Sequence, residues 1–169
     1  RHGKANQDSL EFVKAAYEAI GDNGTVKDAE EFVKQRLENK QLIFGFGHAV
    51  LRVEDPRATL QYEMAKELFP NNPFVKTSLL LREGASNVLK QNPKISNPYP
   101  NVDAISGSLL TASGFGHPVY YTVLFGLSRA VGIARQIVYE RCEARNGKGT
   151  PIIRPKYFFK ECESEAFSF

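Results

Sequence analysis

The sequence has few residues of the kinds that mark several specialised protein classes. It contains two cysteines, Cys142 and Cys162, whose separation fits neither a metal site nor a disulfide framework. We therefore interpret both as free thiols in a reducing compartment. The net charge is only +3, and no block of lysine and arginine occurs. Nucleic acid is thus not an expected partner, whereas small anionic ligands suit this mild positive charge.

The sequence also has few features of a membrane span or of β-strands. The most apolar segment, residues 118–139, is long enough to suggest a membrane span, but it contains Arg129 and Arg135. An arginine is costly inside lipid, so a buried helix of a larger helical protein is the better interpretation. Strand signals are weak, and there is no repeat or low-complexity segment. Because the first residue is Arg1 rather than Met, we expect this to be part of a longer protein.

What is present is a series of helix signals, which predicts an all-α fold. Apolar residues at helical spacing predict a helix over 5–20, and Thr25 with Asp28 resembles a capping box. Aspartate or asparagine followed by proline marks two further starts, at Asp55 and Asn72. The expected helices are 5–20, one beginning after Thr25, 56–69, 73–91, 103–112 and 118–139.

A short stretch, Gly45-Phe46-Gly47-His48 followed by Arg52 and Arg57, has the composition of a site for an anion undergoing proton transfer. Glycines allow a ligand to approach the backbone, a histidine exchanges protons near neutral pH, and arginines pair with carboxylate or phosphate.

Two more titratable residues stand in loops beside helices, namely His2 and Asp103. Together with His48 they permit two readings, a facial metal site or acid–base machinery. Arg57, Arg129 and Arg154 are the accompanying cations. Taken singly, each has a simpler explanation: a terminal residue for His2, a turn for His48, a helix N-cap for Asp103.

The whole chain resembles the citrate synthase family in five motifs that occur in the family's order and nearly its spacing. They are His2-Gly3-Lys4-Ala5-Asn6-Gln7, Gly45-Phe46-Gly47-His48 with Asp55-Pro56-Arg57, Asn101-Val102-Asp103 with Ser106-Gly107, Tyr121-Thr122-Val123-Leu124-Phe125-Gly126 with Ser128-Arg129, and Arg154-Pro155-Lys156. The resemblance is closest to the C-terminal portion of the eukaryotic mitochondrial type.

This resemblance implies citrate (Si)-synthase chemistry with three catalytic residues. Asp103 would take a methyl proton from acetyl-coenzyme A, and His2 would hydrogen-bond the thioester oxygen as the enol forms. His48 would polarise the carbonyl of oxaloacetate, which the enol attacks; hydrolysis of citryl-coenzyme A then releases citrate. Such chemistry depends on stabilising the enol as it forms.

The resemblance also implies the binding residues. Oxaloacetate or citrate would contact His48, Arg57, Phe125, Arg129 and Arg154, the last reaching across from a partner subunit. Coenzyme A would contact Phe44, Gly45, Phe46, Gly47 and Arg52. No metal or tightly bound cofactor is required, because the coenzyme A thioester is a co-substrate.

For the protein as a whole, the resemblance implies a homodimer in the mitochondrial matrix that acts in the tricarboxylic acid cycle. Residues 1–3 would end a large-domain segment, 4–114 would form a small domain, and 115–169 would belong to the large domain. Two alternatives stay open: a 2-methylcitrate synthase that uses propionyl-coenzyme A, which Ile105 and Phe125 do not decide, and an inactive structural or filament-forming relative.

Overall fold

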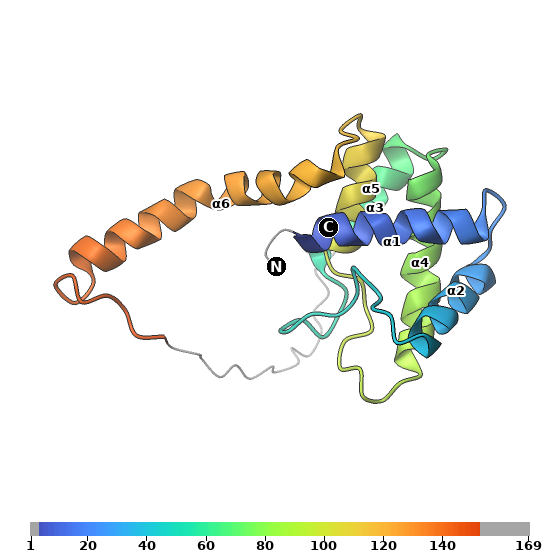
Figure 1. Cartoon of the computed structure of the whole chain (residues 1–169), viewed down its shortest axis with the longest axis horizontal. Coiled ribbons are helices and arrows are strands. Elements are labelled where there is room, and N and C mark those ends of the chain that lie inside the picture. The colour runs from blue at the N-terminus through green and yellow to red at the C-terminus, as the bar shows by residue number, and fades with distance from the viewer. Residues whose placement is uncertain (1–3, 153–169) are drawn as a thin grey trace, which may run out of the picture. The chain divides into compact units, whose positions relative to one another are not determined.

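A computed structural model describes residues 4–152, so His2 and Arg154 lie outside the described residues. The described chain is all-α, as the sequence predicts, and its only β-pairing is an isolated bridge between Phe46 and Pro100. In chain order the helices are α1 (Lys4–Ile20), α2 (Val26–Glu38), α3 (Pro56–Leu68), α4 (Pro73–Lys90), α5 (Asp103–Ala112), the 3-10 turn η1 (Pro118–Tyr120), α6 (Tyr121–Val138) and the π-helical turn η2 (Tyr139–Glu143) (Figure 1).

The helix starts follow from local capping. Thr25 and Asp28 form the expected capping box of α2, with the Thr25 N–H donating to the Asp28 carboxylate at 2.8 Å. Asp55 and Asn72 accept main-chain hydrogen bonds at the starts of α3 and α4, each followed by proline in the first turn. The N-cap position of α5 is Val102 rather than Asp103, and the Asn101 side chain accepts the Asp103 N–H instead, at 2.9 Å.

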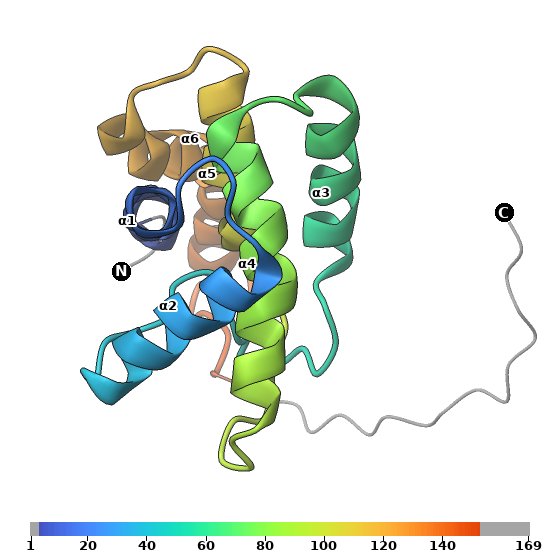
Figure 2. The same cartoon turned by 90° about the vertical axis from the view of Figure 1, so that its right-hand side faces the viewer.

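Helix α4 is the centre of the packing and contacts α1, α2, α3 and α5 (Figure 1 and Figure 2). One buried cluster joins α1, α2 and α4 through Phe12, Val13, Ala16, Ala29, Val33, Leu81, Ala85 and Val88. A second joins α3, α4 and α5 through Ala58, Tyr62, Ala65, Val75, Ala104 and Ile105. Burying these apolar faces against α4 fixes the ends of α3 and α5, from which the candidate site is built.

The chain divides into two compact units between Ser128 and Arg129, within α6. The first unit holds α1 to α5 and the start of α6; the second holds the rest of α6 and the turn after it. The domain boundary expected near residue 114 stays a prediction. Most apolar side chains of α6 are exposed in this chain, with Tyr121 its one buried residue. Within residues 4–152, no helix has the length and apolar character needed to cross a membrane.

Candidate active site

Two loops far apart in sequence are joined by main-chain hydrogen bonds and together form the site. The Asn101 N–H donates to the Gly45 carbonyl at 2.8 Å, and the Gly47 N–H donates to the Tyr99 carbonyl at 3.0 Å. The Asp55 N–H donates to the Pro100 carbonyl at 3.2 Å. We call this paired region, residues 44–55 with 97–103, the loop seam. It brings the His48 loop beside the start of α5, where Asp103 lies.

Gly45 is required where the seam meets the helices. Its φ is +81°, a conformation that side-chain-bearing residues rarely adopt. A Cβ atom built there would lie 2.6 Å from the Ala104 Cα and 2.7 Å from the Ser9 Oγ. The glycine therefore lets the seam lie directly on α1 and α5.

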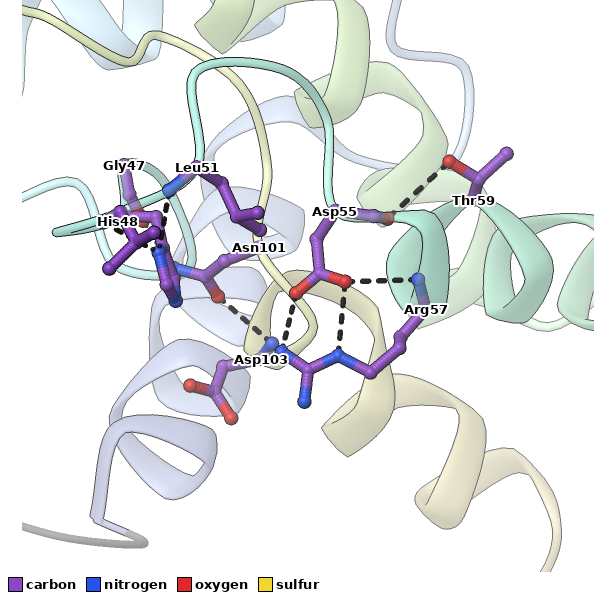
Figure 3. Close-up of polar contacts among 9 residues, drawn as sticks. Gly47, His48, Leu51, Asp55, Arg57, Thr59, Asn101 and Asp103 are labelled. Carbon is purple, nitrogen blue, oxygen red and sulfur yellow. Dashed lines mark hydrogen bonds and ion pairs between the residues drawn. The ribbon is translucent and has the colours of Figure 1, made fainter. Parts of the chain in front are cut away.

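The ring of His48 is oriented by its own loop. Its Nδ1 accepts hydrogen bonds from the N–H groups of Val50 and Leu51, both at 3.0 Å (Figure 3). A nitrogen that accepts two donors uses its lone pair, so Nε2 carries the ring hydrogen. His48 is exposed, and its Nε2–H is thus a hydrogen-bond donor available to a ligand.

Arg52 covers the same turn. Its Nη1 donates to the Leu51 carbonyl at 2.9 Å and lies within 3.4 Å of the carbonyls of His48, Ala49 and Val50. The guanidinium therefore offsets the partial negative charge of the main-chain carbonyl oxygens in the His48 turn, and its side chain stays exposed. Its contact with coenzyme A stays a prediction.

Arg57 is held by a buried carboxylate. Its Nε donates to the Asp55 Oδ1 at 3.0 Å and its Nη2 donates to the Oδ2 at 2.7 Å, which is a bidentate pair. The pKa of Asp55 is lowered, chiefly by these hydrogen bonds, and the pKa of Arg57 is raised by the same pair. The Asp55 side chain is 2% exposed and that of Arg57 is 58% exposed, so the cation faces outward.

Asp103 shares this environment. Figure 3 shows Asp103 near the guanidinium of Arg57, and the charge of Asp103 contributes to the raised pKa of Arg57. Asp103 is half-buried at the first turn of α5. The site therefore places a carboxylate, a guanidinium and an imidazole donor around the loop seam.

The residues expected to bind coenzyme A lie at the start of the seam. Phe44 and Phe46 are half-buried and pack against the cluster of α1, α2 and α4. Phe44 also lines a cavity of ≈ 380 Å³ with Lys4, Ala5, Asp8 and Leu42. The first of its lining residues in the sequence is Lys4, two positions after His2.

The remaining predicted site residues lie on α6 or outside the described residues. Phe125 and Arg129 lie one turn apart on α6, where Phe125 is half-buried and Arg129 is exposed. Phe125 belongs to the unit that contains the loop seam, and Arg129 belongs to the other unit. Their contact with substrate, like that of His2 and Arg154, stays a prediction.

Four supporting residues have no site role predicted from the sequence, although Asn101 and Asp55 stand in the family motifs. Asn101 donates from Nδ2 to the Gly47 carbonyl at 2.9 Å, and Asn97 donates to the Leu51 carbonyl at 2.7 Å. The sequence predicts only a helix cap for Asp55 and no role for Glu54. The two asparagines stand in a proline-marked loop, which was the available signal; nothing local indicated their distant partners.

The described residues do not gather a metal site. Over residues 4–152, no group of three or more His, Cys, Asp or Glu side chains is placed to hold an ion. The metal reading of the sequence depended on His2, which lies outside that range.

Comparison with known proteins identifies the class to which this chain and its fold belong. The family model for the C-terminal domain of citrate synthase matches residues 1–156. The chain is 41% identical over 164 residues to the mitochondrial 2-methylcitrate synthase of Yarrowia lipolytica, covering 97% of this chain and 34% of that protein. It is 38% identical over 170 residues to the mitochondrial citrate synthase of Citrus maxima, covering 98% and 35%. The chain therefore belongs to the citrate synthase family.

Solved structures show the same fold. Citrate synthase from Thermotoga maritima matches with a TM-score of 0.68 and 27% identity, covering 98% of this chain and 41% of that one. The complex of carboxymethyl-coenzyme A and oxaloacetate with citrate synthase from Thermoplasma acidophilum matches with a TM-score of 0.66 and 26% identity, covering 99% and 41%. The helical fold is thus citrate synthase-like, and the chain spans about a third of the length of the two curated relatives.

Proposed function

We propose that the whole protein condenses acetyl-coenzyme A with oxaloacetate and hydrolyses citryl-coenzyme A, giving citrate and coenzyme A. The observation that carries this proposal is the loop seam, which places His48, Arg57 and Asp103 around one region of the surface. A ketone acceptor with carboxylates needs these three groups: a hydrogen-bond donor for its carbonyl, a cation for its charge and a base for the incoming carbon acid.

In this proposal His48 donates from Nε2 to the oxaloacetate carbonyl and makes its carbon more electrophilic. The ring is already held in that tautomer by two main-chain donors, so the donor needs no reorganisation when the substrate binds. Asp103 removes the methyl proton of acetyl-coenzyme A, and His2 stabilises the enol oxygen.

Arg57, Arg129 and Arg154 bind the carboxylates of oxaloacetate or citrate, and Phe125 packs beside them. Phe44, Gly45, Phe46, Gly47 and Arg52 bind coenzyme A. The reaction uses no metal and no tightly bound cofactor, because the thioester itself supplies the activated methyl group. The names of the mitochondrial relatives support a location in the mitochondrial matrix. The family resemblance adds to the proposal that the protein is a homodimer and serves the tricarboxylic acid cycle.

The direct test is turnover of acetyl-coenzyme A and oxaloacetate by the whole protein, followed through the released thiol. Asp103→Ala should lower kcat by roughly 10²–10⁴-fold, the scale of one acid–base group, while oxaloacetate binding is retained. The matched control is Ser113→Ala, at the exposed other end of α5. A folded wild-type protein without turnover would reject the enzyme proposal and favour a structural relative; full activity in Asp103→Ala would remove Asp103 as the base.

A second candidate is 2-methylcitrate synthesis from propionyl-coenzyme A. The 41% identity to the Yarrowia lipolytica enzyme of that name supports it. The two candidates are separated by kcat/KM for acetyl- and propionyl-coenzyme A, measured side by side at saturating oxaloacetate. The substrate with the larger value identifies the activity.

A further inference from the structure

Two consecutive acidic residues, Glu54 and Asp55, end the His48 loop and turn their side chains to different partners. Asp55 has extended backbone angles, φ −65° and ψ 120°, and in extended backbone neighbouring side chains point to opposite sides. Asp55 binds Arg57, as described above. Glu54 binds Arg82, which lies on α4, 28 residues further along the chain.

The carboxylate of Glu54 is fully engaged. Its Oε2 accepts from the Arg82 Nε at 3.0 Å, and its Oε1 accepts from both the Arg82 Nη2 and the Thr59 hydroxyl, the latter at 2.6 Å. The guanidinium of Arg82 also lies over the ring of the buried Tyr62, with its Cζ 4.6 Å from the ring centroid. The loop end is thus joined to both α3 and α4.

Both members of this pair are partly buried. The Arg82 side chain is 32% exposed and the Glu54 side chain is 22% exposed. Burial alone would raise the pKa of Glu54, yet the hydrogen bonds from Arg82 and Thr59 outweigh it and hold the pKa below its ordinary value. A bidentate pair of this kind fixes direction as well as distance.

We propose that Glu54 and Arg82 are positioning residues that fix Asp55, and through Asp55 the guanidinium of Arg57, for binding a substrate carboxylate. The kinetic part of this inference rests on the proposed function. Asp55 accepts both side-chain hydrogen bonds of Arg57, whereas Asp103 acts on the guanidinium through its charge, and the cation is largely exposed. Its direction therefore depends on Asp55, whose main chain is held on one side by the Glu54–Arg82 pair and on the other by Pro100.

The geometry is tested first without any activity, by following the Arg57 Nε–H signal in NMR spectra of the full chain. Glu54→Gln keeps the side-chain shape but removes the charge. Arg82→Met keeps an apolar chain over Tyr62 but removes the guanidinium that donates the two hydrogen bonds. Each should shift or broaden the Arg57 signal, and the double variant should do no more than either alone, because both remove one interaction. Glu11→Gln is the matched control, since it removes an exposed ion pair within α1. An Arg57 signal unchanged in both variants would overturn the proposal.

The kinetic arm uses the whole protein. Both variants should raise KM for oxaloacetate roughly tenfold, the scale of one weakened charge-assisted contact, and leave KM for acetyl-coenzyme A unchanged. A purely structural role would lower the active fraction, and hence apparent kcat, with both KM values unchanged; that outcome would also overturn the proposal. Absence of turnover in the wild type would reject the proposed function instead, and the NMR result alone would then decide the positioning role.

Discussion

The carboxylate of Asp55 accepts hydrogen bonds from both the main chain and the side chain of Arg57. The main-chain bond caps α3, and the side-chain pair orients the guanidinium. Since the group is almost fully buried, its charge is stable in the folded chain only because both sets of bonds are made. One side chain thus links helix stability to the geometry of the site.

Asp55 should make the chain sensitive to acid. Its pKa in the folded state is lowered from the ordinary value of 3.8, so the folded state favours the ionised form. The resulting stabilisation is complete above 3.8 and is lost as the pH falls through the lower folded value. Urea unfolding at a series of pH values should show a smaller loss of free energy on acidification in Asp55→Asn than in the wild type.

Asp8→Asn serves as the control for that experiment, because Asp8 forms a long ion pair with the exposed Lys4, at 3.8 Å, among the described residues. It should leave the acid dependence close to that of the wild type. Parallel curves for the wild type and Asp55→Asn would contradict the stabilising role of the Asp55 charge.

His48 offers a prediction about a single hydrogen atom. Because the Val50 and Leu51 N–H groups both donate to Nδ1, the neutral ring should carry its hydrogen on Nε2. Long-range ¹⁵N–¹H spectra should therefore give Nδ1 the shift of an unprotonated ring nitrogen and Nε2 that of a protonated one. The exposed His117 is the internal reference; the reversed assignment for His48 would exclude the proposed donor.

At the scale of elements, the contact between the loop seam and α5 depends on Gly45, which has no side chain. Gly45→Ala should destabilise the chain by roughly 2–5 kcal/mol, through strain at positive φ and overpacking against Ala104. Gly114→Ala is the matched control: its φ is +94° but its Cβ would meet open space. It should cost only the strain, roughly 1–2 kcal/mol. Equal thermal shifts for the two variants would show that the approach of α5 does not matter.

Local chemistry explains how far the sequence alone predicts these elements. Helix starts at Val26, Pro56 and Pro73 were predicted because their caps lie within three residues of the helix. The loop seam was not predicted, because its hydrogen bonds join main-chain atoms whose partners are set by the packing of α1 and α5. No side-chain pattern encodes such pairing in a loop.

The same reasoning applies to the site. His48, Arg57 and Asp103 were identified by residue type beside glycine or proline and by the family resemblance. The Glu54–Arg82 pair was missed, because Arg82 reads from the sequence as an ordinary cation on a helix. The positioning role of Arg82 depends on Glu54, which is 28 residues away in the sequence and comes within hydrogen-bonding distance only when α3 packs on α4.

At the scale of the whole molecule, α6 is the feature that the described chain leaves uncovered. Leu127 is 69% exposed and Val131 is 83% exposed, and further apolar side chains accompany them along the helix. Exposed apolar surface of this extent favours association. The sequence predicts that this helix is buried in a larger helical protein, which accords with its apolar character.

The 169-residue chain on its own should therefore self-associate through α6. Leu127→Lys combined with Val131→Glu should lower the mass measured by light scattering and leave the thermal midpoint of the helical unit of α1 to α5 unchanged. Leu42→Lys, which changes an equally exposed leucine away from α6, is the control. Association that persists in the double variant would place the contact elsewhere.

The loop seam also has a consequence for the order of folding. It joins residues about fifty positions apart, and closing so long a loop costs entropy that local helix formation does not. The caps of α2, α3 and α4 can form early, whereas His48, Arg57 and Asp103 come together only when the last of these contacts is made. A partly folded chain would thus have helices without the assembled candidate site, and the appearance of that site would be a kinetic marker that the first unit has reached its native state.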